Sequence, residues 1–192
     1  MTPGLVAGVD EAGRGPWAGP VVAAAVILRG AVPAGLNDSK KLSAKRREAL
    51  FLALHDSECL IGVGHASVAE IDAINILQAT YLAMIRAVEA LSEPPAHVLV
   101  DGNRLPKWRW PATAIVGGDD CEPAISAASI IAKVTRDRIM VELDAAHPGY
   151  GWATNQGYGV AAHAGALRRL GATPHHRASF APVKAVLQKM AG

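Results

Sequence analysis

The sequence contains only two cysteines, Cys59 and Cys121, among its 192 residues. Two cysteines cannot form a disulfide framework and match no zinc-binding spacing, so we expect a reducing compartment. Long apolar runs are also missing: the longest, residues 21–28, is far shorter than the ~20 residues that span a bilayer. The chain reaches Asp10 and Glu11 after one short apolar run, which is unlike a secretory signal. These absences predict a soluble, cytoplasmic protein that does not enter a membrane.

Acidic residues are absent from the last quarter of the chain. All 17 lie within residues 1–144, whereas residues 145–192 hold four of the seven histidines and five cations. This distribution suggests a polyanion-binding arm beside a body that needs its own carboxylates. A solvated basic surface would have the same composition, so this feature alone does not distinguish the two. The cations are Arg168, Arg169, Arg177, Lys184 and Lys189, and the histidines are His147, His163, His175 and His176.

Short apolar, β-branched runs predict a five-stranded sheet. Several of these runs stop at acids or glycines, and they cover residues 5–9, 21–28, 60–65, 97–100 and 113–116. The length suits one domain with at most a small appendage.

Helical patterns lie between and after these runs. Ser43 is the expected N-cap of a helix over residues 44–55, and Ser67 with Glu70 forms a capping box that opens a longer helix. A third helix is expected over about 123–145, with an Ala/Ser-rich start that permits close packing on a sheet. Two short helices follow, near 160–170 and 181–190. The face of the longer helix expected to be apolar contains Ile71, Ile74, Leu77, Tyr81, Ile85 and Val88.

Acids follow three of the predicted strands. Asp10 and Glu11 follow the first, Asp101 follows the fourth, and Asp119 with Asp120 follows the fifth. The carboxyl ends of neighbouring strands converge on one crevice of an α/β sheet, where several carboxylates require a cation. Oxygen ligands favour Mg²⁺ or Mn²⁺ over zinc, and such clusters commonly hold two ions ~3.5–4 Å apart for phosphodiester hydrolysis. Any one of these acids could instead be a turn or cap residue.

A Gly-Arg-Gly turn, residues 13–15, comes directly after the first two acids. Such a turn lets backbone amides approach a sugar-phosphate chain, and Arg14 could contact phosphate. It is neither a P-loop nor a dinucleotide-binding motif. A plain tight turn is the alternative.

Taken together, these motifs closely resemble the type 2 ribonucleases H, the ribonuclease HII family. The resemblance covers nearly the whole chain, in the family's order. Its blocks are DEAGRGP at residues 10–16, NDSKKLS at 37–43 with KRR at 45–47, ID at 71–72 with Asn75, DGN at 101–103, GD at 118–119, ISAASIIAKVTRD at 125–137, GY at 157–158 and HHRASF at 175–180.

The resemblance implies an α/β ribonuclease H-like fold, a central mixed five-stranded sheet flanked by helices. It divides the chain into a catalytic domain over residues 1–146 and a basic C-terminal helical substrate-binding region over residues 147–192. The family's four catalytic, metal-binding carboxylates fall on Asp10, Glu11, Asp101 and Asp119, and they imply a two-ion site for Mn²⁺ or Mg²⁺.

The resemblance also assigns substrate-binding residues. Gly13, Arg14 and Gly15 correspond to the turn that reads the ribose 2′-hydroxyl at an RNA–DNA junction. Tyr158 corresponds to the tyrosine that stacks on the neighbouring deoxyribose, although a core or surface aromatic would give the same pattern. Lys40 is expected to meet backbone phosphate, whereas Lys41 fits a solvated surface nearly as well.

One position departs from the family pattern. Many relatives have a lysine two residues before the fourth carboxylate, where this chain has Gly117. Asp120 follows Asp119 directly, so the identity of the fourth ligand is open; alignment favours Asp119, with Asp120 and Glu122 facing solvent or lying outside the ligand set. The Gly-Arg-Gly turn fits the type 2 enzymes better than the related type 3 enzymes, which lack it.

The activity implied is endonucleolytic hydrolysis of RNA in RNA–DNA hybrids and of single ribonucleotides in duplex DNA. The cut falls 5′ of the ribonucleotide and leaves 3′-hydroxyl and 5′-phosphate ends, for ribonucleotide and RNA primer removal. The family expectation is a monomer, and the sequence shows no obvious clamp-binding peptide.

Three other interpretations remain open at this stage. A proofreading-type exonuclease also gathers four acids, although its first two are usually one residue apart. A binding module without catalysis would rest on the basic tail alone. Metal binding by His175 and His176 is a third idea, less favoured than capping or a phosphate contact.

Overall fold

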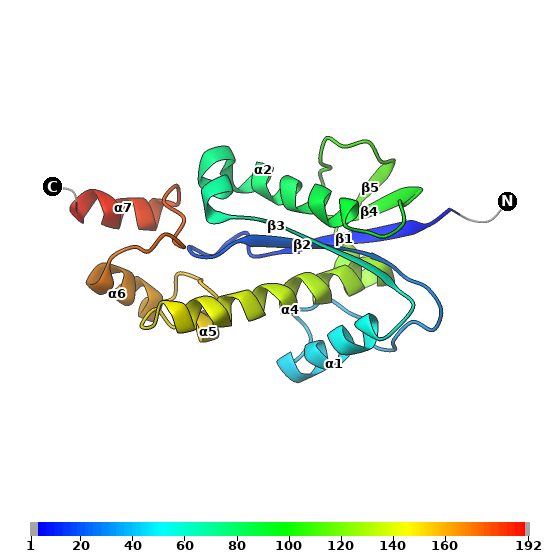
Figure 1. Ribbon diagram of the computed structural model, residues 1–192, viewed down its shortest axis with the longest axis horizontal. Helices are drawn as coiled ribbons and strands as arrows, with labels where there is room; N and C mark the ends of the chain where they lie inside the picture. The colour runs from blue at the N-terminus through cyan, green and yellow to red at the C-terminus, as the bar shows by residue number, and fades with distance from the viewer. Residues whose placement is uncertain (1–3, 191–192) are drawn as a thin grey trace.

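A five-stranded mixed sheet forms the centre of the computed structural model, which describes residues 4–190 (Figure 1). The strand order is β3-β2-β1-β4-β5. β2 pairs antiparallel with β1 and β3, whereas β1 with β4 and β4 with β5 are parallel. The predicted mixed five-stranded sheet is therefore confirmed. Its strands are β1 (Val6–Ala12), β2 (Val21–Ile27), β3 (Leu60–Ala66), β4 (His97–Asp101) and β5 (Ala112–Ile115).

The acids lie differently from the prediction that they follow strands. β1 does not stop before Asp10 but continues to Ala12, because Asp10 and Glu11 keep their register with β2. Asp101 is itself the last residue of β4. Asp119 lies not at a strand end but in a short helix, α3 (Gly118–Cys121). Backbone pairing with a neighbouring strand therefore carries the polar side chains into the sheet.

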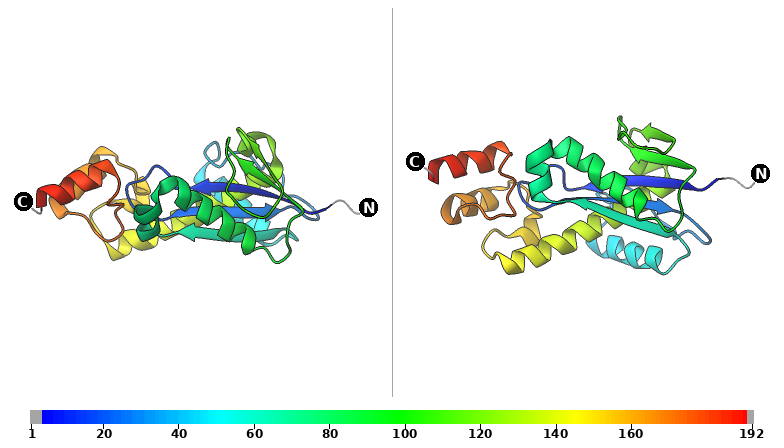
Figure 2. Two further views of the ribbon diagram at one scale, coloured as in Figure 1. Left: turned by 90° about the horizontal axis from the view of Figure 1, so that it is seen from above. Right: turned by 45° about the horizontal axis from the view of Figure 1, so that its top comes forward.

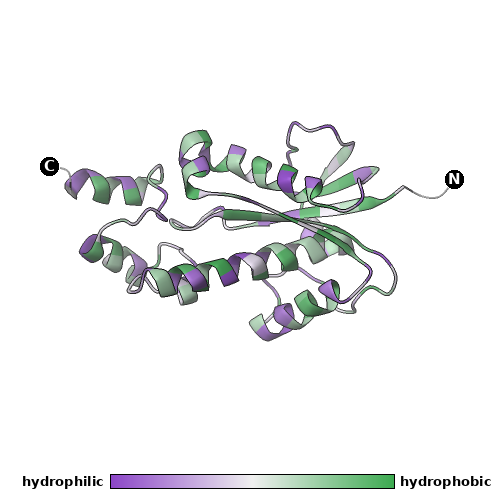
Figure 3. Ribbon diagram, viewed as in Figure 1, coloured by the Kyte–Doolittle hydropathy of each residue, from purple (hydrophilic) through white to green (hydrophobic). Residues whose placement is uncertain are grey.

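Helices cover both faces of the sheet, as Figures 1 and 2 show. α2 (Val68–Glu89) lies on one face, and α4 (Pro123–Ala146) with α1 (Ala44–His55) lies on the other. β2 is buried along its whole length, and its alternate side chains enter two different cores. In Figure 3 the central strands are largely green, the colour of hydrophobic residues. The predicted N-caps Ser43 and Ser67 are confirmed, as is the capping box with Glu70.

Small residues bring the helices close to the sheet. A Cβ on Gly64 would lie 2.3 Å from the Ala83 carbonyl oxygen of α2. On the other face, a Cβ on Gly8 would lie 2.2 Å from the Ala124 carbonyl carbon of α4. The expected close packing of the Ala/Ser-rich start of α4 is therefore present.

The apolar face predicted for α2 is partly wrong. Asn75 has a left-handed backbone (φ 67°) that kinks the helix, and its side chain accepts hydrogen bonds from the backbone N–H groups of Leu77 and Gln78. The kink changes the helical phase, so that Ile74 is 39% exposed. Of the predicted face, Ile71 and Val88 are buried as expected, whereas Leu77, Tyr81 and Ile85 are only half-buried. The other buried residues after the kink are Ala79, Thr80, Ala83, Met84 and Ala87.

By length and composition alone, α2 would also be capable of crossing a membrane. Core helices of soluble proteins share these properties, and α2 packs its alanines into the core beside the sheet. One such helix is therefore weak evidence for a membrane span.

Three helices follow α4: α5 (Trp152–Asn155), α6 (Ala161–Leu170) and α7 (Ala181–Met190). They lie at the end of the molecule away from the N-terminus (Figure 1). α6 and α7 were predicted, whereas α5 was not. Ala18, which follows β1, forms a bridge with His176 and packs in one cluster with Trp152. The C-terminal region thus contacts the segment after β1.

Candidate active site

A cleft of about 460 Å³ opens where β1 and β4 end. Its residues come from both strands, from helices α1 and α4, and from three connecting segments. These segments are the turn after β1, the loop that precedes α1 and the loop that follows α5. Of the predicted site residues, all except Asp119 line it. Its lining residues are Asp10, Glu11, Ala12, Gly13, Arg14, Gly15, Ser39, Lys40, Arg47, Asp101, Ser129, Lys133, Arg136 and Tyr158.

Asp10 is the most buried carboxylate of the cleft, with 4% of its surface exposed. Burial raises its pKa, and the neighbouring charges of Glu11 and Asp101 raise it further. Two hydrogen bonds act in the opposite direction, one from Ser129 and one from the Glu11 backbone N–H at 2.7 Å. The carboxylates are therefore close enough to repel one another, which a bound cation would relieve.

Glu11 and Asp101 lie beside Asp10 with partners of their own. Burial and the charge of Asp101 raise the pKa of Glu11. Arg14 acts in the opposite direction, since its guanidinium lies 3.3 Å from Oε1 of Glu11. One oxygen of Asp101 accepts a hydrogen bond from the backbone N–H of Gly118 at 2.9 Å. This bond joins the end of β4 to the start of α3.

Asp119 does not line the cleft, but it lies next to Lys40, which does. Its side chain is buried, and the Lys40 ammonium is 3.5 Å from Oδ2. Burial raises the pKa of Asp119, as do Asp101 and Asp38, while Lys40 lowers it. Asp120 instead is exposed and pairs with Lys41 at 2.6 Å. The two adjacent acids thus face opposite environments.

The donor chemistry of this site fits a hard divalent cation. Three carboxylates line one cleft, a fourth, that of Asp119, lies beside the cleft residue Lys40, and neither cysteine lines the cleft. Within residues 4–190, however, no three acid or histidine side chains converge on one point as they stand. One oxygen of Glu11 pairs with Arg14, and one oxygen of Asp101 accepts from the Gly118 N–H.

The Gly-Arg-Gly turn and Tyr158 meet at one end of the cleft. Gly13 has a positive φ of 96°, which favours glycine. A Cβ on Gly15 would lie 3.3 Å from the Tyr158 ring. Arg14 points outward, and Tyr158 is 46% exposed. The turn therefore presents backbone beside an accessible aromatic ring.

Several residues around the site received no role from the sequence. Ser129 lies next to Asp10, and its Oγ is 2.9 Å from the Oγ of Ser39. Arg136 and Arg177 are fully buried beneath the Gly-Arg-Gly turn. Arg136 lies in the polar stretch 133–138 of α4, beside Asp137 and Arg138, so the helical pattern alone does not distinguish it from a solvent-facing cation.

The adjacent histidines do not form a metal site. The His176 ring is buried, and its Nδ1 accepts a hydrogen bond from the Thr173 backbone N–H at 3.0 Å. His175 packs against His147 with ring centroids 4.9 Å apart. Backbone capping, which the sequence favoured over metal binding, is what His176 does.

Comparison with known proteins gives consistent matches. The family model described as ribonuclease HII matches residues 7–183. Ribonuclease HII of Sphingopyxis alaskensis is 65% identical over 179 residues, which are 93% of this chain and 90% of that protein. Ribonuclease HII of Jannaschia sp. is 58% identical over 189 residues, 96% of this chain and 93% of that protein.

Solved structures agree with the sequence relatives. The ribonuclease H2 of Pyrococcus horikoshii superposes with a TM-score of 0.77 at 28% identity, covering 97% of this chain and 98% of that one. The Archaeoglobus fulgidus RNase HII, solved in complex with PCNA, gives 0.71 at 27% identity, covering 90% and 93%. Bst-RNase HIII in complex with Mn²⁺ gives 0.69 at 19% identity, covering 96% and 70%, a likeness of fold alone. The expected ribonuclease H-like fold is therefore confirmed.

Proposed function

Because this chain belongs to the ribonuclease HII family, we propose that it cuts DNA duplexes at single embedded ribonucleotides as well as RNA–DNA hybrids. It is a metal-dependent ribonuclease, and RNA–DNA hybrids are its substrates. The proposed cut lies on the 5′ side of the ribonucleotide and leaves 3′-hydroxyl and 5′-phosphate ends. Its cellular use would be ribonucleotide and RNA primer removal in the cytoplasm.

One observation supports this substrate choice most directly. The Gly13–Gly15 turn contacts Tyr158 at one end of the cleft that Asp10, Glu11 and Asp101 line. A ribose held between the turn and the tyrosine would thus have its 5′ phosphate beside the acids. Only a sugar with a 2′-hydroxyl offers the turn an additional hydrogen-bonding group, which is what distinguishes RNA from DNA.

Asp10, Glu11, Asp101 and Asp119 would hold two Mg²⁺ or Mn²⁺ ions. Bound ions of this kind activate water and neutralise charge on the phosphate. Arg14 leaves Glu11 to meet a substrate phosphate, and Lys40 contacts the backbone near Asp119. Water adds to phosphorus, the bond from phosphorus to the 3′ oxygen breaks, and that oxygen takes up a proton.

The test uses a labelled DNA duplex with one ribonucleotide, incubated with Mg²⁺ or Mn²⁺. We expect a single cut 5′ of the ribonucleotide, no cut in the all-DNA duplex, and no cut with EDTA. Asp101→Asn should lower kcat by at least about 100-fold, since it weakens charge stabilisation at the reacting phosphate. The electrophoretic position of the labelled product measures both the site and the rate.

Asp120→Asn provides the matched control. Asp120 is an exposed acid near the site that pairs with Lys41, so its loss should change kcat less than about twofold. Wild-type activity in Asp101→Asn would contradict the assignment of Asp101 as a metal ligand. Cleavage of hybrids without cleavage of the single-ribonucleotide duplex would contradict the proposed substrate.

Membership of the family removes two of the earlier interpretations. A binding module without catalysis and a 3′ exonuclease on plain DNA both disagree with a ribonuclease matched over residues 7–183. The structure of the Archaeoglobus relative with PCNA supports a replication clamp as a candidate partner. We further propose that the chain acts as a monomer, since all four carboxylates come from one chain.

A further inference from the structure

Arg177 is a fully buried arginine bonded only to backbone oxygens. Its guanidinium donates to the carbonyl oxygens of Gly13 at 2.5 Å, Arg14 at 2.9 Å and Gly19 at 3.0 Å. Within the described part of the chain, no carboxylate forms an ion pair with it. Burial lowers its pKa to about 9, which leaves the side chain charged at neutral pH. The charge is therefore stabilised by the carbonyl dipoles of the Gly-Arg-Gly turn and the segment after it.

These bonds fix the direction of two amide groups. No peptide bond in the described chain is cis, so each N–H points opposite to the carbonyl of the same peptide. The carbonyls of Gly13 and Arg14 point inward to Arg177. The N–H groups of Arg14 and Gly15 must then point outward, on the side where both residues line the cleft. Across residues 4–190, neither N–H donates to another protein group.

Arg136 supports the same segment from α4. Its guanidinium donates to the carbonyls of Pro20 at 3.0 Å, Ala18 at 3.1 Å and Gln156 at 3.0 Å. A Cβ on Gly13 would lie 1.9 Å from its Nε, so this side chain passes directly under the turn. Because Gln156 precedes Tyr158 by two residues, Arg136 joins the turn to the segment that carries the tyrosine.

We propose that Arg177, supported by Arg136, is the positioning residue that enables the turn to select a ribose. It holds the amides of Arg14 and Gly15 outward as a pair of donors, and the 2′-hydroxyl oxygen of the substrate accepts from them. The planar guanidinium reaches four carbonyls, those already named and that of Pro20 at 3.3 Å, which the single ammonium of a lysine does not reproduce. This inference rests on the proposed cleavage at embedded ribonucleotides.

The test measures binding, not turnover. Asp101→Asn protein serves as the parent, so that substrate stays intact, and fluorescence anisotropy gives Kd for a duplex with one ribonucleotide and for the same duplex in all-DNA form. The ratio of the two constants is the ribose preference. Arg177→Lys in this parent should lower that preference about tenfold, the effect of misplacing one or two hydrogen bonds. Arg138→Lys, at an exposed arginine of α4 that pairs with Glu48 away from the cleft, is the matched control and should leave it unchanged.

The ratio separates positioning from folding. Partial unfolding of Arg177→Lys weakens binding to both duplexes equally, so an unchanged ratio would overturn the inference. A parent that binds both duplexes equally would instead overturn the proposed ribonucleotide recognition, and the inference with it.

A second measurement needs no substitution at Arg177. In NMR spectra of the ¹⁵N-labelled parent, the amide signals of Arg14 and Gly15 should shift with the ribonucleotide duplex more than with the all-DNA duplex. Equal shifts with both duplexes would contradict the role assigned to these amides.

Discussion

The neighbouring donors and acceptors set the proton positions of two buried imidazoles, His163 and His176. Trp152 Nε1 can only donate, so His163 Nε2, 3.1 Å away, accepts. His163 Nδ1 then carries the proton and donates to the Tyr158 carbonyl at 2.9 Å. His176 Nδ1 accepts from the Thr173 N–H, and its Nε2–H points at His163 Nε2, 3.1 Å away, where it shares the one lone pair with Trp152. Burial lowers the pKa of both imidazoles, which favours their neutral forms, and the chain of bonds ends at the backbone of Tyr158.

This arrangement predicts an acid-sensitive fold. Burial, followed by the neighbouring His163, lowers the pKa of His176 to about 4. In the unfolded chain His176 binds a proton near pH 6.5, whereas in the folded chain it does so only near pH 4. The free energy of unfolding therefore keeps the whole contribution of His176 above pH 6.5 and loses it as the pH falls towards 4. The loss attributable to His176 is on the order of 2–3 kcal/mol. Urea unfolding midpoints measured across this range should show it.

The variant His176→Asn tests how much His176 contributes to the pH dependence of stability. The variant should be less stable than the parent at neutral pH, but its midpoint should fall less between pH 6.5 and 4. His55→Asn, at an exposed histidine of α1, should keep the parent's pH dependence. Parallel curves for the parent and His176→Asn would show that this imidazole does not cause the acid sensitivity.

Glycines at different positions in the fold differ in the side chains that can replace them. Gly165 lies within α6, and a Cβ there would meet nothing within 4 Å. Gly165→Ala should therefore raise the free energy of unfolding by about 0.5–1 kcal/mol, since alanine loses less backbone entropy in a helix. Gly13→Ala should do the reverse, because its φ is positive and Arg136 occupies the space of the new methyl group. Thermal or urea unfolding of both variants checks the pair, and a destabilised Gly165→Ala would contradict the open space found beside Gly165.

Elements with local signals could be predicted from the sequence. Ser43 and Ser67 are capping residues whose hydrogen bonds depend on neighbours three positions away, and both start helices as expected. The β-branched runs likewise marked all five strands. The family resemblance, carried by motifs in order along the chain, brought the predicted site residues to one cleft and its edge.

The features that the sequence did not predict depend on contacts between distant parts of the chain. The kink at Asn75 shifted the buried face of α2, and no periodicity within the helix reports such a phase change. β1 extends through Asp10 and Glu11 only because β2 supplies matching partners. The bonds from Arg177 to Gly13 join residues more than 160 positions apart, so no local pattern could reveal them.

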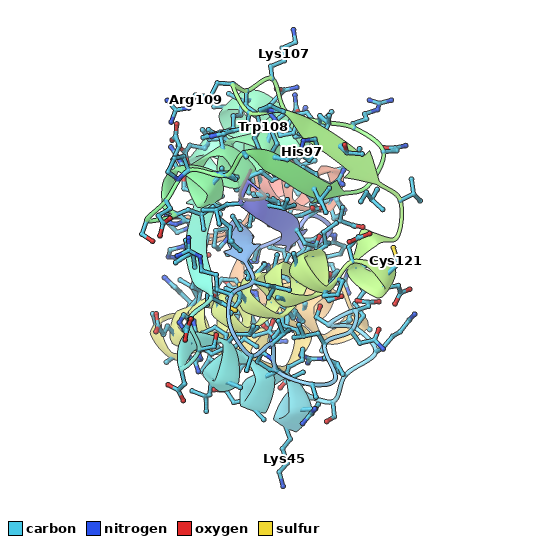
Figure 4. The ribbon with its side chains drawn as sticks, turned by 90° about the vertical axis from the view of Figure 1, so that its right-hand side faces the viewer. Lys45, His97, Lys107, Trp108, Arg109 and Cys121 are labelled. Atoms are coloured by element: carbon cyan, nitrogen blue, oxygen red, sulfur yellow. The ribbon has the colours of Figure 1, made fainter. Side chains whose placement is uncertain are left out.

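Exposed cations form two candidate surfaces for a nucleic acid duplex at the scale of the whole molecule. Arg168 and Arg169 end α6 in the acid-free C-terminal region. Lys107 and Arg109 lie in the loop between β4 and β5 and project from one side of the molecule, opposite Lys45 of α1 (Figure 4). The charge distribution of the sequence favours the first surface as the one that holds the duplex.

Salt dependence separates the two surfaces. Each phosphate contact contributes about 0.9 to the slope of log affinity against log salt concentration. The double variant Arg168→Gln with Arg169→Gln should therefore lower this slope by about 2, and it should weaken ribonucleotide-containing and all-DNA duplexes alike, since phosphate contacts carry no information about the sugar. Anisotropy titrations at several salt concentrations measure the slope, with Lys45→Gln as the control expected to leave it unchanged. If Lys107→Gln with Arg109→Gln lowers the slope and the α6 variant does not, the duplex lies over the β4–β5 loop and the acid-free tail is only a solvated surface.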